Sequence, residues 1–284
     1  VADIIKYKIN LLRNYLSDRS FRVRYEDAVS DFTPILASVP QGSVLGPLLF
    51  LIYLADFPKL RRTKKGKFAD DTALGTFGST PQEANKQLQS SLNKTAKFCA
   101  KWKIKLNSGK SQHTVFSLNK DPITEVKLDG EVIPQKKSAN YLGVLLDRHL
   151  TFRHHIMAKK SQILSKYKKL WWLLKPKSGL STYNKLLLYK VVLKPIWTYA
   201  CPLWGCAKKS NINEIQTMVR HLLGVPTVKE TINQYSLRYA TRLSNHPNDK
   251  AADLLYKYKA GPRRLNRKYP FDCVSSEVIK LMSE

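Results

Sequence analysis

The chain has 284 residues, 43% of them hydrophobic, so it can bury at least one sizeable core, and two domains are a reasonable expectation. Its formal net charge of +28 and pI near 10.0 indicate a polyanionic partner, either nucleic acid or an anionic membrane surface. No stretch approaches the roughly 18 apolar residues of a membrane-spanning helix, and basic residues interleave with aromatic ones along most of the length, which favours nucleic acid.

Cysteine usage indicates a reducing compartment. No C-x-x-C pair occurs among Cys99, Cys201, Cys206 and Cys273. Cys201 and Cys206 could join a zinc site only with distant histidines, so free thiols are the favoured interpretation. No secretory signal is present, and the sequence begins with Val1 inside a helical pattern, which predicts a piece of a longer, non-secreted polypeptide.

The first sixty residues predict two helices with strands between them. Apolar residues at helical spacing predict an amphipathic helix over residues 4–16. Residues 20–30 alternate between apolar and charged side chains, as in a half-buried strand, and a turn leads into a second strand over 35–39. An apolar helix is expected over residues 45–57.

The next ninety residues predict a helix flanked by short strands. Residues 68–77 read as a hairpin with Asp70 and Asp71 at its tip. A helix begins at Thr80 and Pro81, with Thr80 as a possible cap. The strands expected after a turn at 107–110 cover residues 112–118, 126–128 and 139–146.

From residue 151 the chain changes to lysine-rich helices. One apolar stripe runs through residues 156–174, and a second helix is expected over 181–197, kinked or ended by Pro195. A weak helix at 251–258 precedes a basic run at 262–269. The predicted organisation is a mixed region over 1–150, a helical region over 151–243 and a basic C-terminal tail over 244–284.

Two adjacent carboxylates in so basic a chain indicate chemistry on phosphates. Mg²⁺ prefers hard oxygen ligands and usually binds one or two carboxylates together with substrate phosphates. A solvated turn pair is the alternative for Asp70 and Asp71 alone, but the segment at 39–50 makes the combination more specific. There Gly42 lets the backbone approach a nucleotide closely, and Gln41 offers both a donor and an acceptor.

In order and wording these motifs resemble those of reverse transcriptases of non-LTR (LINE-type) retrotransposons, and the jockey-like group most of all. Residues 39–47 resemble the Gln-Gly motif, which shapes the pocket for template base and incoming nucleotide. The resemblance implies that Asp70 and Asp71 are catalytic residues that bind Mg²⁺, with Mn²⁺ as a possible substitute. It also implies nucleotide- and template-binding roles for Pro40, Gln41, Gly42, Phe68 and Ala69.

Two later motifs extend the resemblance. Residues 106–111 resemble the next palm motif, whose lysine neighbours the triphosphate, so Lys110 is implied to neutralise it or to protonate the leaving pyrophosphate. Residues 141–147 resemble the primer-grip hairpin, which implies that Tyr141, Leu142 and Gly143 meet the primer terminus. An ordinary core strand is the alternative there. The lysine-rich helices then occupy the position of a thumb.

The resemblance implies an α+β fold, with a truncated reverse-transcriptase palm (a small antiparallel sheet with helices) followed by a helical thumb. It implies RNA-directed DNA polymerase activity, with an RNA template, a DNA primer and deoxynucleoside triphosphates as partners and no membrane. It also implies nuclear action at the site of target-primed synthesis after cytoplasmic ribonucleoprotein assembly. Oligomeric state does not follow from it.

Three departures from the family pattern leave alternatives open. The first palm motif, with the other catalytic aspartate, and the fingers are expected upstream of this sequence. The strand entering the catalytic hairpin reads Lys-Lys-Gly-Lys at 64–67, a poor candidate for a buried strand, and residues 216–224 look shortened. The alternatives are a catalytically inactive nucleic-acid-binding remnant and, less favoured, a product that does not fold stably.

Overall fold

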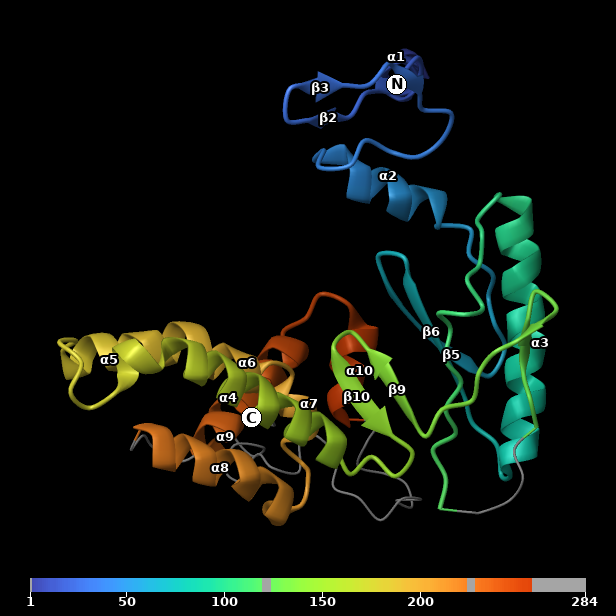
Figure 1. Cartoon of the computed structure of the whole chain (residues 1–284). Helices are drawn as coiled ribbons and strands as arrows, with labels where there is room; N and C mark the ends of the chain where they lie inside the picture. The colour runs from blue at the N-terminus through green and yellow to red at the C-terminus, as the bar shows by residue number, and fades with distance from the viewer. Residues whose placement is uncertain (1, 119–123, 224–227, 257–284) are drawn as a thin grey trace. The chain divides into compact units, whose positions relative to one another are not determined.

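The computed structural model describes residues 2–118, 124–223 and 228–256, which separate into two compact units. The first unit combines residues 2–77 with 86–106, and the second combines 78–85 with the described residues from 107 onward. Helices and small two-stranded sheets make up both, which agrees with the predicted α+β class (Figure 1). The predicted boundary at residue 150 does not coincide with this division, because residues 107–118 and 124–150 group with the helices that follow them.

The N-terminal segment of the first unit contains one helix and two very short strand pairs. Helix α1 is present as predicted. The strand predicted over 20–30 is wrong in form, because the chain reverses at Glu26 (φ 52°) and the strand residues are exposed. The strand predicted over 35–39 is also absent, and Ser38 has a left-handed φ of 92° that interrupts extended backbone. The elements are α1 (Ala2–Leu16), the pair β1 (Ser20–Phe21) and β4 (Thr33–Pro34), and the pair β2 (Arg24–Tyr25) and β3 (Ala28–Val29).

The remainder of the first unit packs around a small aromatic cluster. Helix α2 (Leu45–Tyr53) ends four residues earlier than predicted, and Phe57 beyond it is buried against Phe98 and Cys99 of α3 (Pro81–Lys101). The predicted cap of α3 is confirmed, because the Glu83 amide donates to the Thr80 hydroxyl at 3.2 Å. A hairpin is present as predicted, but it begins five residues before the predicted range of 68–77 and consists of β5 (Thr63–Phe68) and β6 (Asp71–Thr76).

Two hairpins begin the second unit. The predicted strand over 112–118 is wrong, since only a single bridge joins His113 to Gln135 there. The strand predicted at 139–146 is two strands separated by a turn at 142–143. The paired elements are β7 (Lys127–Leu128) with β8 (Glu131–Val132), and β9 (Ser138–Tyr141) with β10 (Val144–Asp147).

Helices form the rest of the second unit and enclose its core (Figure 1). Trp197 and Trp204 are at most 1% exposed and lie in one cluster with Ile215 and Ile232. The cluster therefore joins helices that are far apart in sequence. The helices are α4 (Arg153–Leu174), α5 (Thr182–Leu188), the π-helix η1 (Tyr189–Leu193), α6 (Lys194–Thr198), α7 (Cys201–Trp204), α8 (Lys209–Leu223), α9 (Val228–Ser244) and α10 (Asp249–Tyr256).

The helix predicted over 181–197 is present as the continuous run α5–η1–α6. Pro195 does not end this helical run, because it lies in the first turn of α6. Its missing N–H falls where the backbone hydrogen bonding changes from the π-helical to the α-helical pattern. The weak helix predicted at 251–258 is α10. The basic run at 262–269 and Cys273 lie outside the described residues.

Candidate active site

The β5–β6 hairpin brings the two predicted metal-binding carboxylates to its end. Phe68 pairs with Asp71, so Ala69 and Asp70 form a two-residue turn, with Ala69 in the left-handed region at φ 49°. Asp70 therefore projects from the turn and Asp71 begins the return strand, and both are exposed. The local pairing alone places these two carboxylates next to each other, as predicted.

One face of this hairpin is covered. The residues at odd positions of β5 lie on it: the Thr63 hydroxyl bonds that of Ser91 at 2.7 Å, and the Lys67 amine donates to the Leu54 carbonyl at 3.1 Å. The amines of Lys65 and Lys67 lie 5.1 and 4.3 Å from the Phe57 ring centroid. Burial, followed by the charge of Lys65, lowers the pKa of Lys67.

This covered face explains how a lysine-rich segment forms a strand. The expectation that 64–67 is not a buried strand is confirmed, since those four residues are exposed. The hairpin is nevertheless formed, because the amines of Lys65 and Lys67 lie over the Phe57 ring and that of Lys67 also donates to a backbone carbonyl.

The opposite face of the hairpin is mostly exposed and includes several small residues. Cross-strand partners share a face, so the pairs Phe68–Asp71, Gly66–Ala73 and Lys64–Gly75 place Asp71 among glycine, alanine and phenylalanine. A Cβ atom added at Gly75 would meet no heavy atom within 4 Å. The backbone of this face therefore has open space beside it at Gly75, four residues after Asp71.

The Gln-Gly segment forms a tight turn before α2. Gly42 has φ 81°, a conformation that favours glycine, and Gln41 is exposed. The Ser43 hydroxyl donates to the Pro40 carbonyl at 2.8 Å and accepts from the Gly46 amide at 2.9 Å. These bonds fix the turn and leave the Gln41 side chain free of a structural role in it.

Lys110 and the predicted primer grip both belong to the second unit. Lys110 is exposed in a turn in which its amide donates to Asn107 Oδ1 at 2.9 Å. In the other motif, Leu142 (φ 47°) and Gly143 (φ 72°) form a two-residue turn between β9 and β10, directly after Tyr141. Positive φ at both turn residues is the hairpin geometry that matches strand twist.

Three residues that support the β9–β10 hairpin were not singled out from the sequence. Tyr199 bonds the turn, Asp147 ends β10, and His155 from α4 accepts a hydrogen bond from the Leu145 amide at 3.3 Å through Nδ1. Asp147 is the last residue of the motif at 141–147, but only the fold shows that its carboxylate organises the connection to α4. No sequence signal indicated that Tyr199 and His155 contact this hairpin.

The donor set suits a hard divalent cation only in part. Carboxylate oxygens such as those of Asp70 and Asp71 are the ligands that Mg²⁺ prefers. Within residues 2–118, 124–223 and 228–256, no three His, Cys, Asp or Glu side chains are grouped as a metal site. Among the described cysteines, Cys99, Cys201 and Cys206 are not joined to one another by disulfides.

Comparison with known families shows which family the chain belongs to. Residues 3–146 match the family described as reverse transcriptase (RNA-dependent DNA polymerase). The chain belongs to the reverse transcriptase family. The matched range contains every site residue predicted above, from Pro40 to Gly143.

The relatives of this reverse transcriptase chain confirm the predicted jockey-like group. It is 36% identical, over 93% of its length, to "Probable RNA-directed DNA polymerase from transposon X-element" of Drosophila melanogaster. It is 35% identical, over 91% of its length, to the corresponding transposon BS protein of the same fly. It is 31% identical, over 92% of its length, to "RNA-directed DNA polymerase from mobile element jockey" of Drosophila funebris.

The reverse transcriptase chain spans 32% of the length of each of these three relatives. No solved structure matches it. Among the described residues, no helix is both long enough and apolar enough to cross a membrane.

Proposed function

We propose that this chain carries catalytic residues of an RNA-directed DNA polymerase that extends a DNA 3′-hydroxyl on an RNA template. The observation that carries the proposal is the β5–β6 hairpin, where exposed Asp70 and Asp71 adjoin a strand face that includes Gly66, Ala73 and Gly75. Membership of the reverse transcriptase family and the printed names of the relatives support it.

In this proposal Asp70 and Asp71 hold divalent metal, Mg²⁺ or in its place Mn²⁺. Such ions, when bound in pairs, activate the primer hydroxyl and neutralise the leaving pyrophosphate. Two carboxylates do not complete a two-metal site, so substrate phosphates and a carboxylate outside the described cluster would supply the remaining ligands.

The other predicted residues take substrate-positioning roles in the same proposal. Pro40, Gln41 and Gly42, together with Phe68 and Ala69, form the surface for the template base and incoming nucleotide. The exposed amide of Gln41 and the open backbone at Gly42 suit that task. The uncovered side chain of Phe68, which is 64% exposed, offers an apolar contact for a base or sugar.

The second unit supplies residues for the triphosphate and the primer. Lys110 provides a mobile cation for the triphosphate, and Tyr141, Leu142 and Gly143 form the primer grip. We propose residues 1–150 as the palm, 151–243 as a thumb that follows a phosphate backbone, and 244–284 as a basic tail. Target-primed synthesis in the nucleus after cytoplasmic ribonucleoprotein assembly is part of the same proposal.

Primer extension tests the catalytic roles. The longer polymerase that contains this chain is assayed on an RNA template with a DNA primer and Mg²⁺, as wild type and with Asp70→Asn or Asp71→Asn. Extension should fall by roughly 10³-fold or more, because metal-bound charge supplies several kcal/mol of transition-state stabilisation. Asp129→Asn is a matched control, since Asp129 (φ 54°) also lies in a two-residue hairpin turn and is exposed.

A catalytically inactive nucleic-acid-binding remnant is the second candidate. The net charge of +28 and the lack of a third grouped ligand in the described residues favour it. It predicts binding that falls steeply with salt, no extension by the wild type, and no change in binding with Asp70→Asn. Extension that depends on Asp70 would rule this candidate out.

A further inference from the structure

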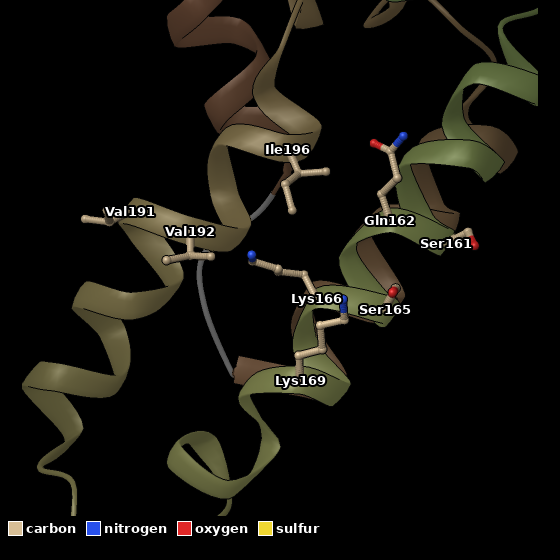
Figure 2. Close-up of a pocket in the computed structure, with 8 residues that line it drawn as sticks. All are labelled: Ser161, Gln162, Ser165, Lys166, Lys169, Val191, Val192 and Ile196. Carbon is tan, nitrogen blue, oxygen red and sulfur yellow. The ribbon is translucent and has the colours of Figure 1, made fainter. Parts of the chain in front are cut away.

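A groove of about 640 Å³ runs along α4 in the second unit. Figure 2 shows the Lys166 amine extending from α4 into the space in front of Val192. One wall is therefore polar and cationic, and all of it comes from a single helix. Its residues are Ser161, Gln162, Ser165, Lys166 and Lys169.

The opposite wall is apolar and comes from η1 and α6. It presents Val191, Val192 and Ile196, and Val191 is 64% exposed. Both valines belong to the π-helical turn of η1, and in Figure 2 the Val192 side chain extends toward α4 while that of Val191 extends away from it. Such turns are rare and occur frequently at functional sites.

An exposed tryptophan continues the groove along α4. Trp172 follows Lys169 by three residues, so it lies on the same helical face one turn further on. It is 66% exposed, and Trp171 beside it is 49% exposed with its ring edge-on to Tyr167. An indole left in water next to a groove indicates an interaction surface.

The charge around this surface indicates which class of partner binds to it. No acidic residue occurs between Asp147 and Glu214, a stretch that contains α4, η1 and α6 in full. Lys168 and Lys175 flank the two tryptophans in sequence. A cationic surface interleaved with aromatic and apolar side chains matches nucleic acid better than an apolar protein partner.

We propose that this groove and Trp172 form a binding site for single-stranded nucleic acid. The amines of Lys166 and Lys169 hold the backbone phosphates, the valine wall contacts bases, and the Trp172 indole stacks on one base. A duplex hides its base faces, so only an unpaired strand can use both the indole and the apolar wall. From Gln162 to Trp172 the helix covers about 15 Å, enough for a few nucleotides.

The inference goes beyond the proposed polymerase chemistry, because the site requires neither Asp70 nor a metal ion. Binding to an oligonucleotide and extension of a primer are separate measurements, so failure of one does not imply failure of the other.

Fluorescence anisotropy tests the site. A labelled, unstructured single-stranded RNA and a duplex of the same length are titrated with the chain at fixed salt. Trp172→Ala should weaken single-strand binding by about ten-fold or more, since stacking on an aromatic side chain contributes roughly 1–3 kcal/mol per base. Trp172→Phe should retain most of the affinity and Trp172→Leu should not, because only phenylalanine keeps a π-face. Duplex binding should change little.

Matched variants distinguish binding at the groove from the general effect of the positive charge of the chain. The pair Lys166→Ala and Lys169→Ala is compared with Lys229→Ala and Arg242→Ala, two exposed cations of α9 that carry the same total charge. The groove pair should lose single-strand affinity by several-fold more than the α9 pair. Thermal unfolding should be unchanged by Trp172→Ala, because the side chain is exposed.

Two results would overturn the proposal. One is equal single-strand affinity of wild type, Trp172→Ala and Trp172→Leu. The other is an equal loss of duplex and single-strand binding on substitution of Trp172. That result would indicate a surface that does not distinguish unpaired bases from a duplex.

Discussion

The side-chain hydroxyl of Tyr199 donates a hydrogen bond of 2.7 Å to the backbone carbonyl oxygen of Leu142. The two residues are 57 positions apart, and the bond joins the β9–β10 turn to the junction of α6 and α7. A Cβ atom added at Gly143 would lie 3.4 Å from the same ring, and the Lys159 amine lies 5.3 Å from the ring centroid. The proposed primer grip is thus positioned by the helical part of its own unit.

Tyr199→Phe should lower the free energy of unfolding by about 0.5–1 kcal/mol, since it removes one half-exposed hydrogen bond and keeps the ring contact. Equilibrium urea unfolding measures the change. Tyr183→Phe on α5 is the control, because that side chain is 74% exposed. Equal effects of the two substitutions would mean that the Tyr199 hydroxyl does not hold the turn.

Asp147→Asn should destabilise the chain by about 2–3 kcal/mol. Its carboxylate accepts from the His149 and Thr151 amides at 3.2 and 3.0 Å, from the Thr151 hydroxyl at 3.1 Å and from the Phe152 amide at 2.7 Å. An asparagine keeps one acceptor oxygen and turns an NH₂ group toward a donor, and hydrogen bonds to charged groups contribute the most. Denaturant unfolding, with Asp129→Asn as control, measures the loss.

The same carboxylate should make the stability of the chain depend on pH. Burial raises the pKa of Asp147, but hydrogen bonds from Thr151, Phe152 and His149 outweigh it and hold that pKa below its usual value. A depressed carboxyl pKa contributes stability above the unfolded-state pKa and loses it as pH falls through the folded-state value. Asp147→Asn should therefore flatten the acid side of the stability profile. An unchanged acid side would contradict this role for the carboxylate.

His155 should lower the free energy of unfolding as the pH falls from 7 to 5. Burial, followed by the charge of Lys159, lowers the pKa of His155 to about 4, and its Nδ1 accepts from the Leu145 amide, which requires a neutral ring. Because the folded-state pKa lies below the unfolded value near 6.5, this stability is present at pH 7 and is lost as pH falls. The linked loss by pH 5 is at most about 2 kcal/mol.

His155→Leu isolates that contribution. Urea unfolding at pH 7 and pH 5 should show a smaller difference for the variant than for the wild type, because the buried titrating ring is gone. His154→Leu on the exposed neighbouring position is the control. If both variants keep the wild-type difference, another group carries the pH dependence.

Local patterns in the sequence predicted the elements whose determinants are local. The Thr80–Pro81 start of α3, the amphipathic α1 and a hairpin that carries Asp70 and Asp71 all follow from neighbouring residues. The strand predicted over 112–118 failed because apolar alternation does not supply a pairing partner, and only one bridge forms there. The strand over 139–146 is divided because Leu142 and Gly143 adopt positive φ.

The parts that the sequence did not predict depend on distant contacts. The roles of Tyr199 and His155 arise from a hydrogen bond to a backbone atom in another element, and backbone acceptors and donors have no residue-type signature. The helices α8 and α9 lie within the helical region predicted over 151–243, but their separate bounds were not predicted. Their buried residues, such as Ile215 and Ile232, can be recognised as core residues only from the fold, where they pack in one cluster with the tryptophans.

The fit of α7 against α9 offers a direct test of whether the chain folds as described. A Cβ atom at Gly205 would overlap the Ile232 side chain and lie 2.7 Å from the Cys201 carbonyl oxygen. Gly205→Ala should therefore cost at least about 2 kcal/mol through overpacking. Gly179→Ala, where no heavy atom lies within 4 Å, should change stability by about 0.5 kcal/mol or less. A cooperative wild-type transition that Gly205→Ala lowers and Gly179→Ala leaves in place would establish this packing. The absence of any cooperative transition in the wild type would favour a product that does not fold stably.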